Sequence, residues 1–217
     1  CITPISRRYE LLGWASAGEG RFIIEDDYDS EFRLTGRPIP TMMGIDVSGR
    51  VIYMNTFSKT LTPTIRISYM VLPDKLVEVF HRELGFYSCT VSNFEQYTLA
   101  RFIRAGYFEK HINRMRNCYR RRREALLQTM KAGGLFHHAD LIERGSGLHF
   151  LLRFHTGKDD HVLQQELSQK GIRMRPLSDY YVGSAEGAAH TFVLNYSGME
   201  EDCLDEAIDR IVSCLEA

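Results

Sequence analysis

Two short apolar segments, each followed at once by a polar cluster, constrain the fold of this chain most. Residues 21–24, Arg-Phe-Ile-Ile, have the composition of a buried strand and run directly into an acidic stretch at residues 25–31. Residues 51–54, Val-Ile-Tyr-Met, form a second such segment, and a hydroxyl-rich turn that contains Lys59 follows it. Open α/β sheets place ligand contacts at the carboxyl ends of their buried strands. The pattern therefore predicts an α/β fold with a site where these two strands end.

The rest of the chain alternates helical and strand-like segments. Helices are predicted at residues 6–15, 73–84, 92–105, 107–132, 160–170 and 200–215, and further strands at residues 66–72, 147–154, 172–175 and 191–196. Residues 33–49 contain five Gly or Pro breakers and are predicted to be a loop. We expect one domain over residues 1–106, and a long helix with a smaller α+β domain over residues 107–217.

Composition excludes several classes of protein. A net charge of −1 over 217 residues gives no field that would draw the chain to nucleic acid or membrane, and no apolar run approaches a membrane span. Five scattered cysteines without C-x-x-C spacing argue against a disulfide framework or a zinc site and favour a reducing, cytoplasmic compartment. The first residue is not Met, so we expect the sequence to be a fragment of a longer chain.

Lys59 is the candidate for covalent chemistry. Burial and nearby positive charge lower the pKa of a lysine, and the free amine then forms a Schiff base with a carbonyl group, which is how enzymes hold pyridoxal phosphate. Asp26 is placed to keep a pyridine nitrogen protonated, and Tyr28, two residues along an extended chain, to reach the ring's phenolic oxygen. Three residues supply phosphate-binding hydroxyl and guanidinium groups: Thr56, Ser58 and Arg66.

Interpretations of the same residues without catalysis or cofactor binding also stay open at this point. Lys59 also fits a solvated surface lysine, and the acidic stretch fits a solvated loop or a metal site. The run at residues 120–123, four arginines, cannot form one face of a helix and is expected to be a solvated or ion-paired surface. His137-His138-x-Asp140 is expected to be a polar loop, His149 a core or pocket-wall histidine, and Gly145-Ser146-Gly147 a turn into a strand.

The motifs together resemble the MocR/GabR family of GntR-type bacterial transcription regulators. The resemblance rests on Glu25-Asp26-Asp27-Tyr28-Asp29-Ser30-Glu31-Phe32-Arg33, on Gly36-Arg37-Pro38-Ile39-Pro40 and on Thr56-Phe57-Ser58-Lys59-Thr60-Leu61-x-Pro63-x-x-Arg66. It extends over nearly the whole chain. Members of this family join a winged helix-turn-helix DNA-binding domain to a fold-type I aminotransferase-like domain. The chain resembles the C-terminal half of that second domain.

The resemblance implies a role for each candidate residue. Lys59 matches the Schiff-base lysine (internal aldimine), Asp26 the partner of the pyridine nitrogen, Tyr28 the contact to the phenolic oxygen and Arg66 a phosphate ligand. Thr56 and Ser58 fall at hydroxyl positions of the phosphate-binding turn. Residues 1–106 would be the C-terminal part of the large cofactor-binding domain. A small amine or amino acid would act as effector by exchanging with Lys59, the chain would form a homodimer, and DNA would bind only through an N-terminal winged helix that is absent from these residues.

One departure from the family bears on the effector. In GABA-responsive members an arginine follows the strand at residues 192–197 and binds the carboxylate of the ligand, but Gly198 stands there in this chain. Arg153, Arg173 and Arg175 are possible substitutes, and the sequence does not select among them. Three functions therefore stay open: an effector-sensing domain of a regulator, which the motifs favour; an active class I/II aminotransferase; and a dimerisation domain that no longer uses the cofactor.

Overall fold

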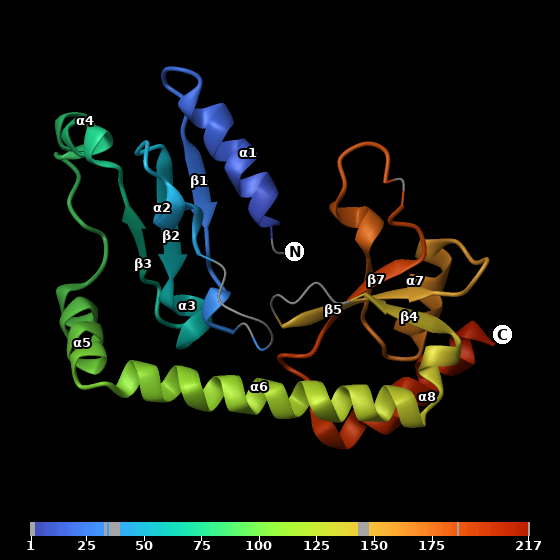
Figure 1. Cartoon of the computed structure of the whole chain (residues 1–217). Coiled ribbons are helices and arrows are strands. Elements are labelled where there is room, and N and C mark those ends of the chain that lie inside the picture. The colour runs from blue at the N-terminus through green and yellow to red at the C-terminus, as the bar shows by residue number, and fades with distance from the viewer. Residues whose placement is uncertain (1–2, 33, 35–39, 143–147, 186, 217) are drawn as a thin grey trace. The chain divides into compact units, whose positions relative to one another are not determined.

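A computed structural model of the chain describes residues 3–32, 34, 40–142, 148–185 and 187–216. The chain divides into two compact units, Cys1–Met115 and Arg116–Ala217, each of which has its own sheet (Figure 1). Most of the Gly36-to-Pro40 motif, Arg33 and Gly145-Ser146-Gly147 lie outside the described residues. Among the residues that the structure does describe, no helix has the length and apolar character needed to cross a membrane.

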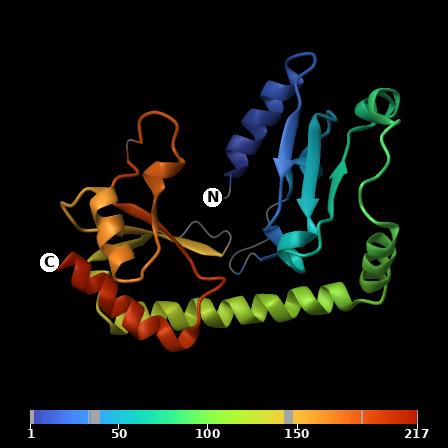
Figure 2. The ribbon, with the colours of Figure 1, turned by 180° about the vertical axis from the view of Figure 1, so that it is seen from behind.

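The first unit is built on a three-stranded mixed sheet in the order β1-β2-β3. Strand β1 (Ile23–Asp26) runs parallel to β2 (Val51–Thr56), and β3 (Ser68–Val71) runs antiparallel to β2. Helix α1 (Ile5–Ser16) lies beside β1, as Figures 1 and 2 show. Its Leu12 packs with Val51 of β2 and with Met42 in a small buried core.

Helices complete the first unit and lead out of it. After β2 comes the single-turn helix α3 (Phe57–Thr60), and after β3 come α4 (Asp74–Leu84), α5 (Asn93–Arg104) and the long helix α6 (Tyr107–Ala132). The loop expected at residues 33–49 is wrong in part, because residues 42–45 form the short helix α2 (Met42–Ile45). Two side chains stabilise its first turn: Thr41 Oγ1 accepts from the Gly44 N–H, and the Glu25 carboxylate accepts from two backbone N–H groups.

The second unit is built on a four-stranded antiparallel sheet in the order β4-β5-β7-β6. Its strands are β4 (Ala139–Ile142), β5 (His149–Phe154), β6 (Arg175–Pro176) and β7 (Thr191–Asn195), and its helices are α7 (Asp160–Gln169) and α8 (Leu204–Leu215). The polar loop expected at His137-His138-x-Asp140 is wrong. Residues 135–137 form a 3₁₀ turn and residues 139–142 form β4, which pairs with β5.

This second sheet has two unlike faces. One face is buried and carries Phe150, Leu152, Phe154, Phe192 and Leu194, which share a core with leucines and isoleucines of α7 and α8. The alternate positions form what we call the open face. It comprises Asp140, Leu151, Arg153, Arg175, Val193 and Asn195, all of them half-buried or exposed. In the ladder Arg153 lies opposite Asp140, and Val193 lies between Leu151 and Arg175, so these side chains share one side of the sheet.

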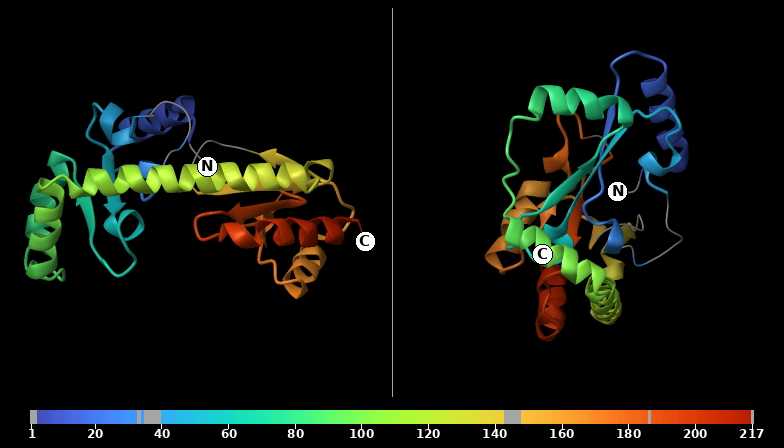
Figure 3. Two further views of the ribbon diagram at one scale, coloured as in Figure 1. Left: turned by 90° about the horizontal axis from the view of Figure 1, so that it is seen from below. Right: turned by 90° about the vertical axis from the view of Figure 1, so that its left-hand side faces the viewer.

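Helix α6 continues without interruption from the first unit into the second. It ends as expected at a glycine pair, where Gly134 adopts the left-handed conformation with φ of 72°. Gly133 is required for a different reason. A Cβ atom there would lie 2.7 Å from Cγ2 of Ile208, because α8 passes close to the end of α6 (Figure 3).

Candidate cofactor site

The residues singled out from the sequence meet at one edge of the first sheet. Because β1 and β2 are parallel, with Asp26 opposite Met54, the polar clusters that follow the two strands lie at the same end. Strand β3 begins at that end, since Ser68 pairs with Thr56, so Arg66 also lies there. The segment after β1 and the segment between β2 and β3 thus bring a carboxylate, an amine and a guanidinium group to one sheet edge.

Lys59 sits in the last turn of α3, and its side chain is exposed. Of the two interpretations that the sequence left open, the described residues therefore give Lys59 the solvent exposure of a surface lysine. What is buried is the residue after it, Thr60, whose carbonyl oxygen lies 3.0 Å from Nε2 of His111. The backbone beside Lys59 is thus held in place while its amine is left accessible.

The phosphate-binding candidates form a hydrogen-bonded group around the same turn. Arg66 Nη1 donates to Ser58 Oγ at 3.4 Å, and Ser58 Oγ donates to the Ile65 carbonyl at 2.5 Å. Thr56 is the N-cap of α3: its Oγ1 accepts from the Ser58 N–H at 3.2 Å and donates to the Ile67 carbonyl at 3.2 Å. Arg66 is exposed, so its guanidinium group is accessible to an anion. The Thr56 hydroxyl already donates one hydrogen bond and accepts another, and so stabilises the turn.

Asp26 and Tyr28 are both exposed at this edge. The expectation that Tyr28 follows Asp26 along an extended chain is wrong, because β1 ends at Asp26 and Tyr28 lies in a turn. The negative charge of Asp29 raises the pKa of Tyr28, with smaller contributions from burial and from Asp26. Tyr28 therefore stays a phenol over a wide pH range and keeps an O–H group that donates.

A polar network that the sequence did not reveal lies behind this edge. Asn55 is buried, and its Nδ2 group donates to Glu31 Oε1 at 3.2 Å and to Tyr53 Oη at 3.0 Å. Its Oδ1 atom accepts from the Thr56 N–H at 2.6 Å. Tyr53 Oη in turn donates to Asp27 Oδ2 at 3.1 Å. The network joins the turn after β1 to the end of β2, and so fixes Tyr28's turn relative to the Lys59 helix.

A buried ion pair fixes the other side of β1. Arg8 of α1 and Glu25 of β1 are 6% and 8% exposed, and Arg8 Nη1 lies 3.4 Å from Glu25 Oε1. Both carboxylate oxygens also accept from α2, at 2.7 Å from Met42 N and 3.0 Å from Met43 N. Since neighbouring residues of a strand point to opposite faces, anchoring Glu25 inward directs Asp26 outward.

Comparison with known proteins adds to this geometry. No protein-family profile matches the chain. It is 40% identical over 211 residues to the HTH-type transcriptional regulator YhdI of Bacillus subtilis, covering 97% of this chain and 44% of YhdI. It is 36% identical to the probable rhizopine catabolism regulatory protein MocR of Rhizobium meliloti, covering all of this chain and 43% of MocR. The chain is homologous to MocR-type regulators. It spans less than half the length of these relatives.

Solved structures show the fold of this chain. Kynurenine aminotransferase of Pyrococcus horikoshii superimposes with a TM-score of 0.79 at 29% identity, over 97% of this chain and 51% of the enzyme. The fold is therefore that of the fold-type I, pyridoxal-phosphate-dependent aminotransferases, as the sequence motifs predicted. That enzyme's structure was solved in complex with pyridoxamine phosphate.

Two other features that the sequence singled out have no site of their own in the described residues. Among the described residues no three His, Cys, Asp or Glu side chains gather as metal ligands, so the acidic stretch shows no metal site there. The arginine run is dispersed, as expected: Arg120 contacts Asn117, Arg122 donates to the Ser197 carbonyl and Arg123 lies over the Phe150 ring.

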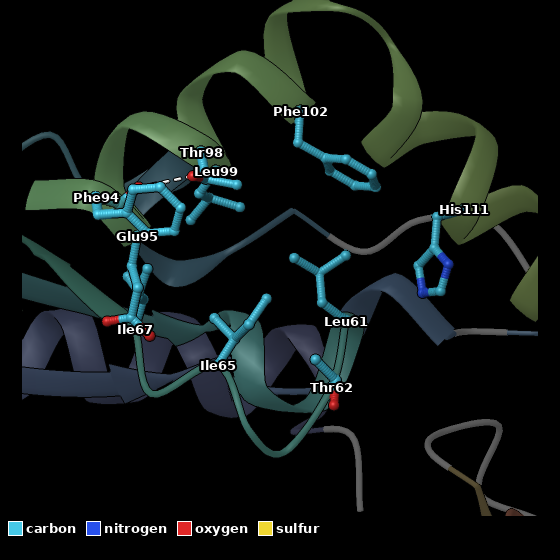
Figure 4. Close-up of a pocket in the computed structure, with 10 residues that line it drawn as sticks. All are labelled: Leu61, Thr62, Ile65, Ile67, Phe94, Glu95, Thr98, Leu99, Phe102 and His111. Atoms are coloured by element: carbon cyan, nitrogen blue, oxygen red, sulfur yellow. Dashed lines mark hydrogen bonds between the residues drawn. The ribbon is translucent and has the colours of Figure 1, made fainter. Parts of the chain in front are cut away.

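An apolar cavity of about 330 Å³ adjoins the segment after Lys59 (Figure 4). Leu61, Ile65 and Ile67 lie on one side of it, and Phe94, Leu99 and Phe102 of α5 lie on the other, with His111 at one end. The remaining lining residues are Thr62, Glu95 and Thr98. None of the six predicted cofactor-binding residues lines it. This cavity therefore does not provide the polar groups that a phosphorylated pyridine requires.

The donor set at the sheet edge does fit such a cofactor. A phosphate monoester needs a guanidinium group and hydroxyls, which Arg66 and Ser58 supply 3.4 Å apart. A pyridinium nitrogen needs a carboxylate, which Asp26 supplies, and a phenolic oxygen needs a donor, which Tyr28 supplies. Lys59 is the amine at this edge.

Proposed function

We propose that this chain is the cofactor-binding, effector-sensing part of a MocR-type transcription regulator. The observation that carries the proposal is the meeting of Asp26, Lys59 and Arg66 at one sheet edge in a chain homologous to MocR and YhdI. Pyridoxal phosphate, when bound, supplies an aldehyde that reacts reversibly with primary amines and a ring that withdraws electrons.

The chain's own residues divide the work of binding. Arg66 binds the phosphate with its guanidinium group, and the Ser58 hydroxyl joins it by turning away from the Ile65 carbonyl. Asp26 holds a proton on the pyridine nitrogen. Tyr28 donates to the phenolic oxygen, and its raised pKa keeps that proton in place. Lys59 provides the attaching amine, and its exposure lets a small amine or amino acid compete for the same position.

Regulation would follow from that competition. A ligand shifts a conformational equilibrium only if it interacts differently with the two states, and exchange at Lys59 changes which groups occupy the sheet edge. In this proposal the chain acts as a homodimer in the cytoplasm, and DNA binding belongs to a winged helix outside these 217 residues.

The decisive experiment is a cofactor-loading assay. The chain purified with pyridoxal phosphate should show the visible absorption of the bound cofactor, and borohydride reduction should leave the cofactor on Lys59. The Lys59→Ala variant should lose both signals, while Lys75→Ala, an α4 lysine outside the site, should keep them. A colourless protein without a trapped group on Lys59 would overturn the proposal.

An active aminotransferase is the second candidate. It is favoured by the 29% identity to kynurenine aminotransferase and by 26% identity over 222 residues to an aromatic-amino-acid aminotransferase of Thermococcus litoralis. Lys59, released by the substrate, would then move the proton as a general base. Sustained conversion of an amino acid and a keto acid into new products would establish this function. A single stoichiometric exchange without turnover would favour the sensor.

A further inference from the structure

The helix that carries Lys59 is too short to be stable by itself. Helix α3 has four residues, Phe57–Thr60, and an isolated turn of helix does not form from propensity. The carbonyl groups of its last turn have no donors within the helix. Lys59 is the third of these residues and is exposed, so packing around its own side chain does not hold the helix either. The position of Lys59 therefore depends on contacts from outside α3.

The start of α6 contacts both ends of α3, and all of these residues belong to the first unit. The ring of Phe57 packs edge-on against the ring of Phe108, with the ring centroids 5.8 Å apart. At the other end, the Thr60 carbonyl oxygen lies 3.0 Å from Nε2 of His111. Phe108 and His111 are three residues apart in α6, so they lie on one face of it. Lys59 is thus placed between two residues that α6 holds.

The two polar neighbours of the His111 ring determine which nitrogen carries the proton. A carbonyl oxygen only accepts, so Nε2 carries the N–H group that donates to Thr60. The Arg114 guanidinium group only donates, and its Nη2 atom lies 3.3 Å from Nδ1, so Nδ1 is an acceptor. Both contacts therefore require the same tautomer. They orient the ring from two sides, and its N–H group points at the carbonyl of a residue that is only 2% exposed.

We propose that His111 is a positioning residue for Lys59. The inference rests on the proposed function and deepens it, because it assigns a role to a residue that lies 52 positions after Lys59 and outside the predicted cofactor-binding set. His111 does not react in this role. It holds the Thr60 carbonyl, and with it the backbone from which the Lys59 side chain extends.

The step that depends on this position is the attachment of Lys59 to the cofactor. A C=N bond forms between Nζ of Lys59 and the aldehyde carbon, and the aldehyde oxygen leaves as water with the two protons of the amine. The step needs no oxidant or reductant. A misplacement of about 1 Å in a reacting group lowers a rate by up to about a hundredfold, so a donor that fixes the neighbouring residue affects the rate of attachment.

Loading of the 217-residue chain with two probes tests the inference. Pyridoxal phosphate can attach to Lys59, whereas pyridoxamine phosphate carries an amine in place of the aldehyde and can only bind. At saturating pyridoxal phosphate, the rate at which a borohydride-trapped adduct appears on Lys59 measures attachment after binding. His111→Leu leaves the buried Thr60 carbonyl without this donor and should slow attachment by at least about fivefold. It should change the dissociation constant of pyridoxamine phosphate, measured by equilibrium dialysis, by less than about twofold.

Two variants separate positioning from general damage to the fold. His111→Gln keeps an N–H donor for the Thr60 carbonyl and should restore the attachment rate to within about twofold of the wild type. His81→Leu removes an exposed histidine from α4, in the same unit, and should leave the rate unchanged.

The outcomes distinguish this inference from the proposed function. It would be overturned alone if His111→Leu attached as fast as the wild type, if His111→Gln were as slow as His111→Leu, or if His111→Leu also lost pyridoxamine phosphate binding. In each of these cases a wild-type adduct on Lys59 would still support the proposed function. A wild-type chain that forms no adduct on Lys59 would overturn both.

Discussion

Removing the Glu25 carboxylate should destabilise the first unit strongly. Glu25→Ala leaves the Arg8 charge buried at 6% exposure and without its carboxylate partner. It also leaves the backbone N–H groups of Met42 and Met43 without the acceptor that they have in the structure. Breaking a buried ion pair by removing one partner costs about 3–5 kcal/mol. Since domains have a total stability of about 5–15 kcal/mol, this loss is a large fraction of the whole.

The chain carries its own reporter for the measurement. Trp14 is the single tryptophan, and it lies on α1, the helix that carries Arg8. Urea titration followed by Trp14 fluorescence therefore reports on the first unit alone. Glu25→Gln, which keeps the shape and one acceptor oxygen, should cost less than Glu25→Ala, about 1–3 kcal/mol.

A neighbouring ion pair provides the control. Arg7 and Glu10 are also an arginine–glutamate pair, at 2.6 Å, but their side chains are 62% and 60% exposed. Glu10→Ala should therefore change the free energy of unfolding by less than about 0.5 kcal/mol. If Glu25→Ala moved the urea midpoint no further than Glu10→Ala does, burial would not be what gives the Glu25 pair its importance.

Three further outcomes follow from local geometry. Asn55→Leu removes a buried amide that bridges two side chains and a backbone N–H, and should cost about 1–3 kcal/mol in the same titration. Gly133→Ala places a methyl group 2.7 Å from an α8 side chain and should cost about 1–3 kcal/mol by circular dichroism, whereas Gly13→Ala meets nothing within 4 Å and should be neutral or stabilising. His155 has a raised pKa because it hydrogen-bonds the Asp140 carboxylate, 3.1 Å away. Its contribution to stability should be present below the ordinary histidine pKa of about 6.5 and be lost as the pH rises through the raised value. An NMR titration of His155 with a midpoint at or below 6.5 would contradict this.

The sequence predicted that the candidate residues would lie at one sheet edge, because that information is local. A buried strand followed by a polar cluster predicts a sheet edge, and two such segments at parallel strands predict a common edge. The sequence therefore predicted that Asp26 and Lys59 lie near each other. It did not predict the direction of the Asp26 side chain, because that depends on which face of β1 the Glu25–Arg8 pair anchors, and Arg8 lies 17 residues away from Glu25.

The errors have a common physical cause. Helix α2 is too short to form from propensity, and it exists because Glu25 and Thr41 accept from its first turn. Strand β4 directly follows two histidines and carries Asp140, a pattern typical of a loop, and it is ordered by pairing with β5. In both cases a partner outside the segment decides the local structure.

The two faces of the sheet in the second unit should tolerate substitutions differently. Substitutions among Phe150, Leu152 and Phe192 alter the packed core and are paid for in stability. Substitutions at Leu151, Arg175 or Val193 alter the open face and leave that packed core in place. A shift of one residue in strand register would exchange the two sets, so burial of the first face fixes the register. The same folded scaffold can therefore carry different open faces.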